Sequence, residues 1–203
     1  MCVTAARAER ATVDGMPNLP RMEFEGAIYH VTTRAIVTMF TDAVDREYFL
    51  HLLAKAIDSH GCVCHAYCLM GNHYHLLIET PKPNLALGMR QLNSAYAGWF
   101  NYRHGRRGPL CEKRYGAVLI ERDAHLLEVV RYIALNPVRA GLCERAEDWP
   151  WSSYRATAGL RPKPRFLHTD WILEQFHGKR ERYREFVAEG APSASLPGLL
   201  IAA

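Results

Sequence analysis

Two pairs of polar residues in this 203-residue chain have the types and spacing that metal and nucleophile chemistry requires. His73 and His75 are two residues apart and precede the apolar run 76–78. Side chains alternate across a strand, so both imidazoles would lie on one face and could bind one divalent ion, given a third ligand. Taken alone, the short motif favours two ordinary strand histidines.

The second pair, Tyr132 and Asn136, is four residues apart in a segment with helical periodicity, so both side chains share one stripe. A phenol can be a nucleophile that forms a covalent intermediate when a base or a cation assists it. An amide oxygen is a hard ligand that suits Mg²⁺ or Mn²⁺. Spacing alone favours the alternative, a tyrosine packed at a helix edge and an asparagine that caps the helix before Pro137.

The net charge of +4 is concentrated in one segment, 101–116, which we call the basic loop. It contains a single acidic residue, Glu112, and five basic residues: Arg103, Arg106, Arg107, Lys113 and Arg114. This pattern is typical of a loop that follows phosphate groups and equally of a solvated loop, and charge alone does not choose between them.

The elements that would position these residues follow from hydrophobic periodicity. It predicts strands over 27–34, 62–69, 73–80 and 115–122, helices over 42–59 and 85–102, and a helix capped by Asp123 that ends at Asn136-Pro137. This order predicts an α+β fold with a ferredoxin-like antiparallel sheet, helices on one face, and a C-terminal helical extension. The extension contains one charged helix over 170–189.

The composition, with 49% hydrophobic and 23% charged residues, is that of a soluble globular protein. Apolar runs such as 196–203 are far shorter than the roughly 20 residues that cross a bilayer, so we expect no membrane segment. No secretory signal is visible, so a reducing cytoplasm is expected. Cys62, Cys64 and Cys68 share parity and are predicted to be buried thiols on one strand face rather than zinc ligands.

The motif residues resemble a known family, the single-tyrosine transposases. The segment 69–78 (LMGNHYHLLI) resembles their His-hydrophobic-His strand, and 131–142 (RYIALNPVRAGL) resembles their tyrosine helix. The segments 26–34 and 148–154 resemble the first strand and the aromatic run after the helix. The similarity covers about residues 20–155 and is greatest to the REP-associated tyrosine transposases.

This resemblance implies a role for each site residue. It assigns His73 and His75 to a metal pair, Asn136 to the third ligand and Tyr132 to the nucleophile, with Mg²⁺ or Mn²⁺ as the ion. The implied substrate is single-stranded DNA next to hairpins, cut and rejoined through a 5′-phosphotyrosine during DNA transposition or a domesticated version of it.

The resemblance also implies a domain division and favours phosphate contact by the basic loop. Residues 1–20 would be a disordered extension, with Met16 an alternative start, 21–155 the catalytic domain, and 156–203 a linker and helical tail. Tyr102 and Tyr115 flank the loop and would either stack on bases or pack in the core. Cys111 and Glu112 stand where the family often has an aromatic residue and a glutamine.

Two other functions stay open at this point: a hydrolytic His-metal nuclease, and a non-catalytic nucleic-acid-binding regulator. Neither of them requires Tyr132 together with Asn136. Both a monomer and a homodimer are compatible with the sequence, as is a tyrosine acting in cis or in trans. The expected location is the cytoplasm, at the nucleoid.

Overall fold

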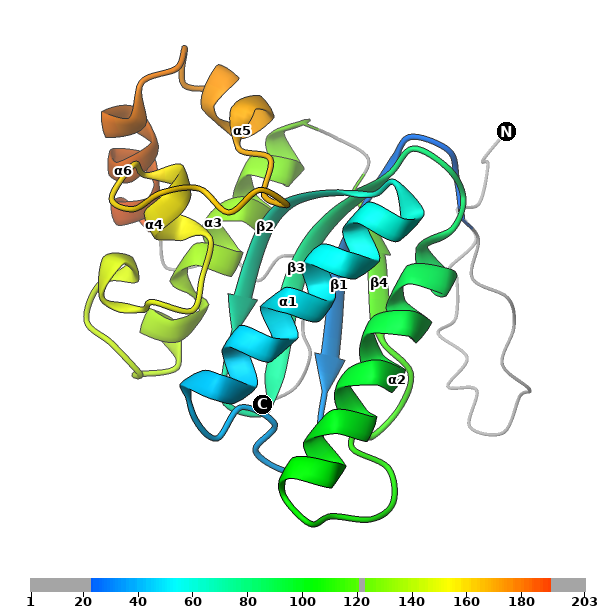
Figure 1. The fold of residues 1–203 in the computed structure, drawn as a ribbon. Helices are drawn as coiled ribbons and strands as arrows, with labels where there is room; N and C mark the ends of the chain where they lie inside the picture. The colour runs from blue at the N-terminus through cyan, green and yellow to red at the C-terminus, as the bar shows by residue number, and fades with distance from the viewer. Residues whose placement is uncertain (1–22, 121–122, 191–203) are drawn as a thin grey trace, which may run out of the picture.

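The computed structural model describes residues 23–120 and 123–190, which contain one four-stranded sheet (Figure 1). The strands are β1 (Ala27–Arg34), β2 (Val63–Leu69), β3 (His73–Thr80) and β4 (Gly116–Leu119). All neighbours pair antiparallel in the order β2-β3-β1-β4, the ferredoxin-like arrangement, so the predicted fold class is confirmed. The expectations for 1–20, for Met16 and for the end of the tail lie outside the described residues.

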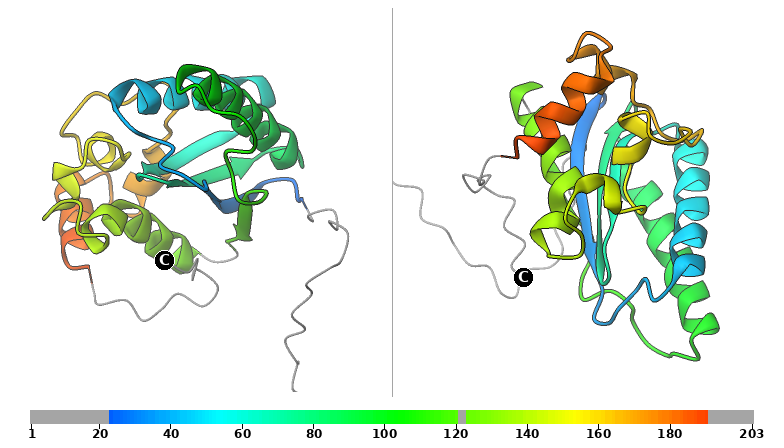
Figure 2. Two further views of the ribbon diagram at one scale, coloured as in Figure 1. Left: turned by 90° about the horizontal axis from the view of Figure 1, so that it is seen from below. Right: turned by 90° about the vertical axis from the view of Figure 1, so that its left-hand side faces the viewer.

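Two long helices, α1 (Ala43–His60) and α2 (Leu85–Arg103), cover one face of the sheet (Figure 2). The N–H of Asp45 donates to the carboxylate of Asp42 at 3.0 Å, the expected N-cap of α1. α1 ends at Gly61, whose φ of 61° lies in the left-handed region that favours glycine. In the described part of the chain, no helix is long and apolar enough to cross a membrane.

A third long helix, α3 (Asp123–Arg139), packs on the opposite face of the sheet (Figure 2). The expectation of helices on one face therefore describes α1 and α2, whereas α3 buries its own apolar stripe, including Val129 and Ile133, with Leu77 of β3. Beside α3 lie four short elements: η1 (Ala146–Asp148), α4 (Tyr154–Thr157), α5 (Asp170–Glu174) and α6 (Arg180–Ala188).

Two predicted helix boundaries are wrong. α3 continues past Asn136 to Arg139 with Pro137 inside it, because the proline removes only one backbone donor from the helix. The chain leaves the helix at Gly141, whose φ of 67° lies in the left-handed region. The predicted helix over 170–189 is two helices, because His177 and Gly178 both adopt left-handed conformations between them. β4 is shorter than the predicted 115–122, of which 121 and 122 lie outside the described residues, as does the side chain of Asp123 that was predicted to cap α3.

The β2–β3 register shifts between Cys64 and Ala66, which identifies a β-bulge. Because the bulge breaks the alternation, Cys64 packs in the α1–α2 core and Cys68 in the core under α3. The prediction of one shared face is therefore wrong for Cys68. The prediction of buried thiols is confirmed, and burial raises the pKa of both thiols.

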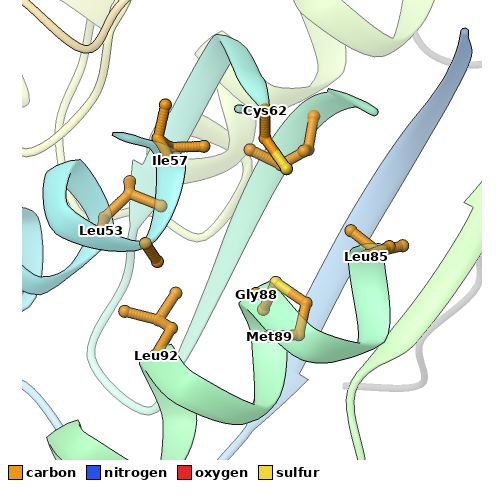
Figure 3. A pocket seen from close by; sticks show the side chains of 9 residues that line it. Leu53, Ile57, Cys62, Leu85, Gly88, Met89 and Leu92 are labelled. Carbon is orange, nitrogen blue, oxygen red and sulfur yellow. The ribbon is translucent and has the colours of Figure 1, made fainter. Parts of the chain in front are cut away.

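The core between α1, α2 and the sheet contains an apolar cavity of about 20 Å³ between the last turns of α1 and the first turns of α2 (Figure 3). Leu53 and Ile57 of α1 face Leu85, Met89 and Leu92 of α2 across it. A cavity of this size and apolar lining has no polar partner for water.

Candidate active site

β3 positions the two histidines that the sequence analysis singled out. His73 and His75 flank Tyr74, which is fully buried in the α1–α2 core, so both imidazoles lie on the opposite face of the sheet. Their ring centroids are 5.1 Å apart. Their cross-strand partners on β1 are Arg34, opposite His73, and Thr32, opposite His75.

α3 carries Tyr132 over the same face. The ring of Tyr132 lies edge-on to His75, with centroids 5.5 Å apart, and edge-on to His30 of β1 at 5.9 Å. The guanidinium carbon of Arg139, from the last turn of α3, is 5.2 Å from the centroid of the Tyr132 ring. Tyr132 is half-buried.

Asn136 lies one turn beyond Tyr132 and is buried beside His73, to which it hydrogen-bonds. Because α3 continues to Arg139, Asn136 is inside the helix rather than at its cap. The Nδ1 atom of His73 is also 2.8 Å from the side-chain oxygen of Asn72, which orients the ring. The structure thus brings His73, His75, Tyr132 and Asn136 together in one chain.

Both imidazoles are held neutral. Burial lowers the pKa of His73 to about 4, with the nearby Arg34 acting in the same direction and the hydrogen bond to Asn136 opposing it. Burial lowers the pKa of His75 well below its usual value, and His30, His73 and Arg34 add to this effect. A neutral imidazole keeps the lone pair that a metal ligand needs.

The donor set fits a divalent cation. The Nε2 atom of His75 is buried and has no hydrogen-bond partner among the described residues, which is uncommon for a polar atom at such a site. Across 23–120 and 123–190, no three or more His, Cys, Asp or Glu side chains form a metal-binding group. The buried side chain of Asn136 lies beside His73, and one amide oxygen with two imidazole nitrogens is a donor combination suited to Mg²⁺ or Mn²⁺.

His30 also lies on this face, although it was not among the site residues predicted from the sequence. It is buried on β1, its Nε2 atom is 3.0 Å from Nδ1 of His75, and the two rings stack with centroids 5.2 Å apart. Burial lowers the pKa of His30 to about 4, helped by the nearby His125. The signal was available, because His30 has the same strand parity as Thr32 and Arg34.

The basic loop runs beside the end of β1 that carries Arg34. The N–H of Ile36 donates to the carbonyl of Leu110 at 3.0 Å, and the N–H of Glu112 donates to the carbonyl of Arg34 at 3.1 Å. Arg107, Lys113 and Arg114 are exposed, Arg106 is half-buried, and none of the four forms an ion pair with another described residue.

Arg103 differs from the other basic residues of the loop. It forms ion pairs with Asp42, at 2.7 Å, and with the fully buried Asp45, so it connects the end of α2 to the start of α1. The two flanking tyrosines also differ from each other. Tyr115 is buried in the α1–α2 core, whereas Tyr102 is 89% exposed. Of the two alternatives left open, packing therefore describes Tyr115 but not Tyr102.

The sheet order and the polar face together define a class of protein: a ferredoxin-like domain whose central strand presents two neutral histidines to a tyrosine and an asparagine on a facing helix. The chain belongs to the IS200-like transposase family, because the sequence model of that family matches residues 24–136. This match spans more than half of the chain and includes the four residues.

Individual relatives agree with this family. The chain is 29% identical over 100 residues to a Haemophilus influenzae protein named as a REP-associated tyrosine transposase. That alignment covers 44% of this chain and spans only 57% of the relative's length. A solved structure of a REP-associated tyrosine transposase bound to a REP hairpin shares the fold, with a TM-score of 0.61 at 19% identity, over 72% of this chain and 89% of that chain. The resemblance drawn from the motifs is confirmed.

Proposed function

We propose that this protein cuts and rejoins single-stranded DNA next to hairpins through a covalent 5′-phosphotyrosine on Tyr132. His73, His75 and Asn136 would hold the Mg²⁺ or Mn²⁺ ion. The observation that carries the proposal is the phenol ring of Tyr132 edge-on to the neutral His75, with centroids 5.5 Å apart. Two findings support DNA as the substrate. The chain belongs to a transposase family, and the relatives it matches are named as REP-associated transposases, one of them bound to a REP hairpin.

A bound divalent ion supplies electrophilic activation of the scissile phosphate. Tyr132 attacks phosphorus through its phenolic oxygen, forming a P–O bond while the bond to the 3′-oxygen breaks. The phenol loses its proton, and the departing 3′-oxygen takes one up. One phosphodiester is exchanged for another, so attack by a second 3′-hydroxyl regenerates the tyrosine and joins DNA without a nucleotide cofactor.

Two arginines assist this chemistry in the proposal. The guanidinium carbon of Arg139 lies 5.2 Å from the centroid of the Tyr132 ring and would place a positive charge beside the attacking group. Arg34, the cross-strand partner of His73, places a positive charge where a phosphate would approach the histidines. Both cations would stabilise the extra negative charge that develops on phosphorus.

The DNA strand would reach this site along the basic loop. Arg106, Arg107, Lys113 and Arg114 would contact phosphates, and the exposed Tyr102 offers a ring on which a base can stack. Arg103 was predicted to contact phosphates as well, but its charge is already balanced by Asp42 and Asp45, so we assign it a smaller share.

A single chain places Tyr132 over its own histidines, which supports a cis arrangement and activity as a monomer, although the homodimer stays compatible with it. The protein would act on DNA at the nucleoid, in the cytoplasm. Its task would be transposition or a domesticated derivative of it.

The test incubates the protein and Mn²⁺ with labelled single-stranded oligonucleotides that carry hairpins of the host genome. We expect a protein–DNA adduct that survives denaturation and is lost in Tyr132→Phe, while Tyr48→Phe, a matched change on α1, retains it. An adduct of equal yield in Tyr132→Phe would refute the proposal. Cleavage without adduct would indicate the hydrolytic nuclease, and binding without cleavage would indicate the regulator.

A further inference from the structure

The strongest unassigned feature of the molecule is the buried pair His30 and His75. We propose that His30 is a positioning residue for the metal site: it accepts the Nδ1–H of His75 in the one proton arrangement that leaves the lone pair of His75 on Nε2, where the ion binds. This inference rests on the proposed metal-dependent function and deepens it.

The backbone fixes the geometry of the pair. β1 and β3 are the two central strands and pair along the whole of both, with Thr32 opposite His75 and His30 opposite Leu77. His30 and His75 are therefore diagonal neighbours on one face. Both are almost completely buried, their facing nitrogens are 3.0 Å apart, and their rings are within 10° of parallel. Neither ring can turn without losing this hydrogen bond.

A neutral imidazole has one N–H and one lone pair, so two proton arrangements fit the 3.0 Å contact. In the first, His75 donates from Nδ1, its Nε2 keeps the lone pair, and His30 carries its proton on Nδ1. In the second, His30 donates, His75 carries its proton on Nε2, and that nitrogen cannot bind a cation. Only the first arrangement is competent to hold an ion.

The protein alone does not choose between the two arrangements. The outer nitrogens, Nε2 of His75 and Nδ1 of His30, both lack a hydrogen-bond partner among the described residues, so neither is committed to a proton. A cation at Nε2 of His75 selects the first arrangement and leaves the N–H on Nδ1 of His30. Because the His30 ring also contacts Tyr132, metal occupancy changes the polarity of a group that touches the nucleophile.

Without His30, the Nδ1–H that His75 must carry to bind an ion through Nε2 would be buried without an acceptor. Loss of such an outer partner commonly weakens metal binding by about 10- to 100-fold, so we expect that range for His30→Leu, measured by Mn²⁺ titration with electron paramagnetic resonance. His30→Gln keeps an acceptor oxygen and should recover most of the affinity. His65→Leu is the matched control, because His65 is equally buried but pairs with Glu79 on the sheet away from the site.

A second measurement uses the wild-type protein, so its result does not depend on whether a variant folds. Nitrogen-15 NMR of the histidines in the wild-type protein with diamagnetic Mg²⁺ should show the proton on Nδ1 in both His75 and His30. A proton on Nε2 of His30 in the metal-loaded protein would overturn the inference, as would unchanged Mn²⁺ affinity in a folded His30→Leu variant.

The two proposals fail in different ways. If the wild-type protein shows no Mn²⁺ binding that His73→Ala removes, the metal-dependent function and the role of His30 fall together. If the wild-type protein binds Mn²⁺ in that way and His30→Leu binds it equally well, only the role of His30 falls. Circular dichroism of each variant establishes that the comparison is between folded proteins.

Discussion

The packing of α3 on the sheet should control the chemistry of Tyr132, and Ile133 tests this without touching a site residue. Ile133 is 1% exposed and belongs to the core cluster that joins α3 to β2 and β3. Truncating such a buried side chain to alanine costs about 2–5 kcal/mol of unfolding free energy, because apolar contacts are lost and a cavity remains. For a chain of this size that corresponds to a melting temperature roughly 4–20 °C lower.

Leu92→Ala is the matched change on the other side of the sheet. Leu92 is also 1% exposed, but it lies in the α1–α2 core and does not contribute to the α3 interface. We expect a similar loss of stability from both variants. We expect a different effect on DNA cleavage, because displacement of a reacting group by about 1 Å can cost on the order of 100-fold in rate.

The assay measures the rate of adduct formation with a labelled oligonucleotide, well below both melting temperatures, so that both variants are folded. Ile133→Ala should react much more slowly than the wild-type protein, whereas Leu92→Ala should react at nearly the wild-type rate. Equal rates for the two variants would show that the packing of α3 on the sheet does not position Tyr132.

Three further outcomes are expected. In urea denaturation, Gly98→Ala in α2 should stabilise the protein by about 0.5–1 kcal/mol, whereas Gly61→Ala should destabilise it because its φ is positive; equal effects would contradict this. Burial lowers the pKa of His30 and of His73 from 6.5 to about 4, so between these pH values the unfolded chain binds more protons than the folded one. The unfolding free energy should therefore fall as the pH drops from 6.5 towards 4. A urea midpoint that does not change over this pH range would disprove the prediction. Arg114→Gln should reduce the salt dependence of single-stranded DNA binding by a log–log slope of about 0.7, as measured by fluorescence anisotropy, and an unchanged slope would exclude a phosphate contact.

Much of the fold, and the pairing of site residues within one strand and within one helix, followed from periodicity, whereas the meeting of the two pairs was implied only by the family resemblance. Strand alternation placed His73 and His75 on the same face, and helical spacing placed Tyr132 and Asn136 on one stripe, because both patterns depend only on local geometry. The strand over 27–34 has the predicted bounds, since its β-branched and aromatic residues pack on a sheet.

The features that periodicity missed depend on contacts between distant segments. The bulge beside Cys64 moves the side chain of Cys68 to the other face of the sheet, and no residue type in β2 predicts a bulge at that position. Arg103 forms ion pairs with Asp42 and Asp45 because α1 and α2, which are distant in sequence, pack side by side. The helix break at Gly178, by contrast, had a visible signal in the glycine itself.

The central claim is a phosphotyrosine on one named residue, and mass spectrometry of the trapped complex tests it most directly. The protein is incubated with Mn²⁺ and a hairpin oligonucleotide, digested with nuclease and protease, and searched for peptides that carry a nucleotide. We expect a nucleotide linked through its 5′-phosphate to Tyr132 and a released DNA fragment with a free 3′-hydroxyl. A nucleotide on any other residue, or cleaved DNA that carries a free 5′-phosphate and no protein, would contradict it.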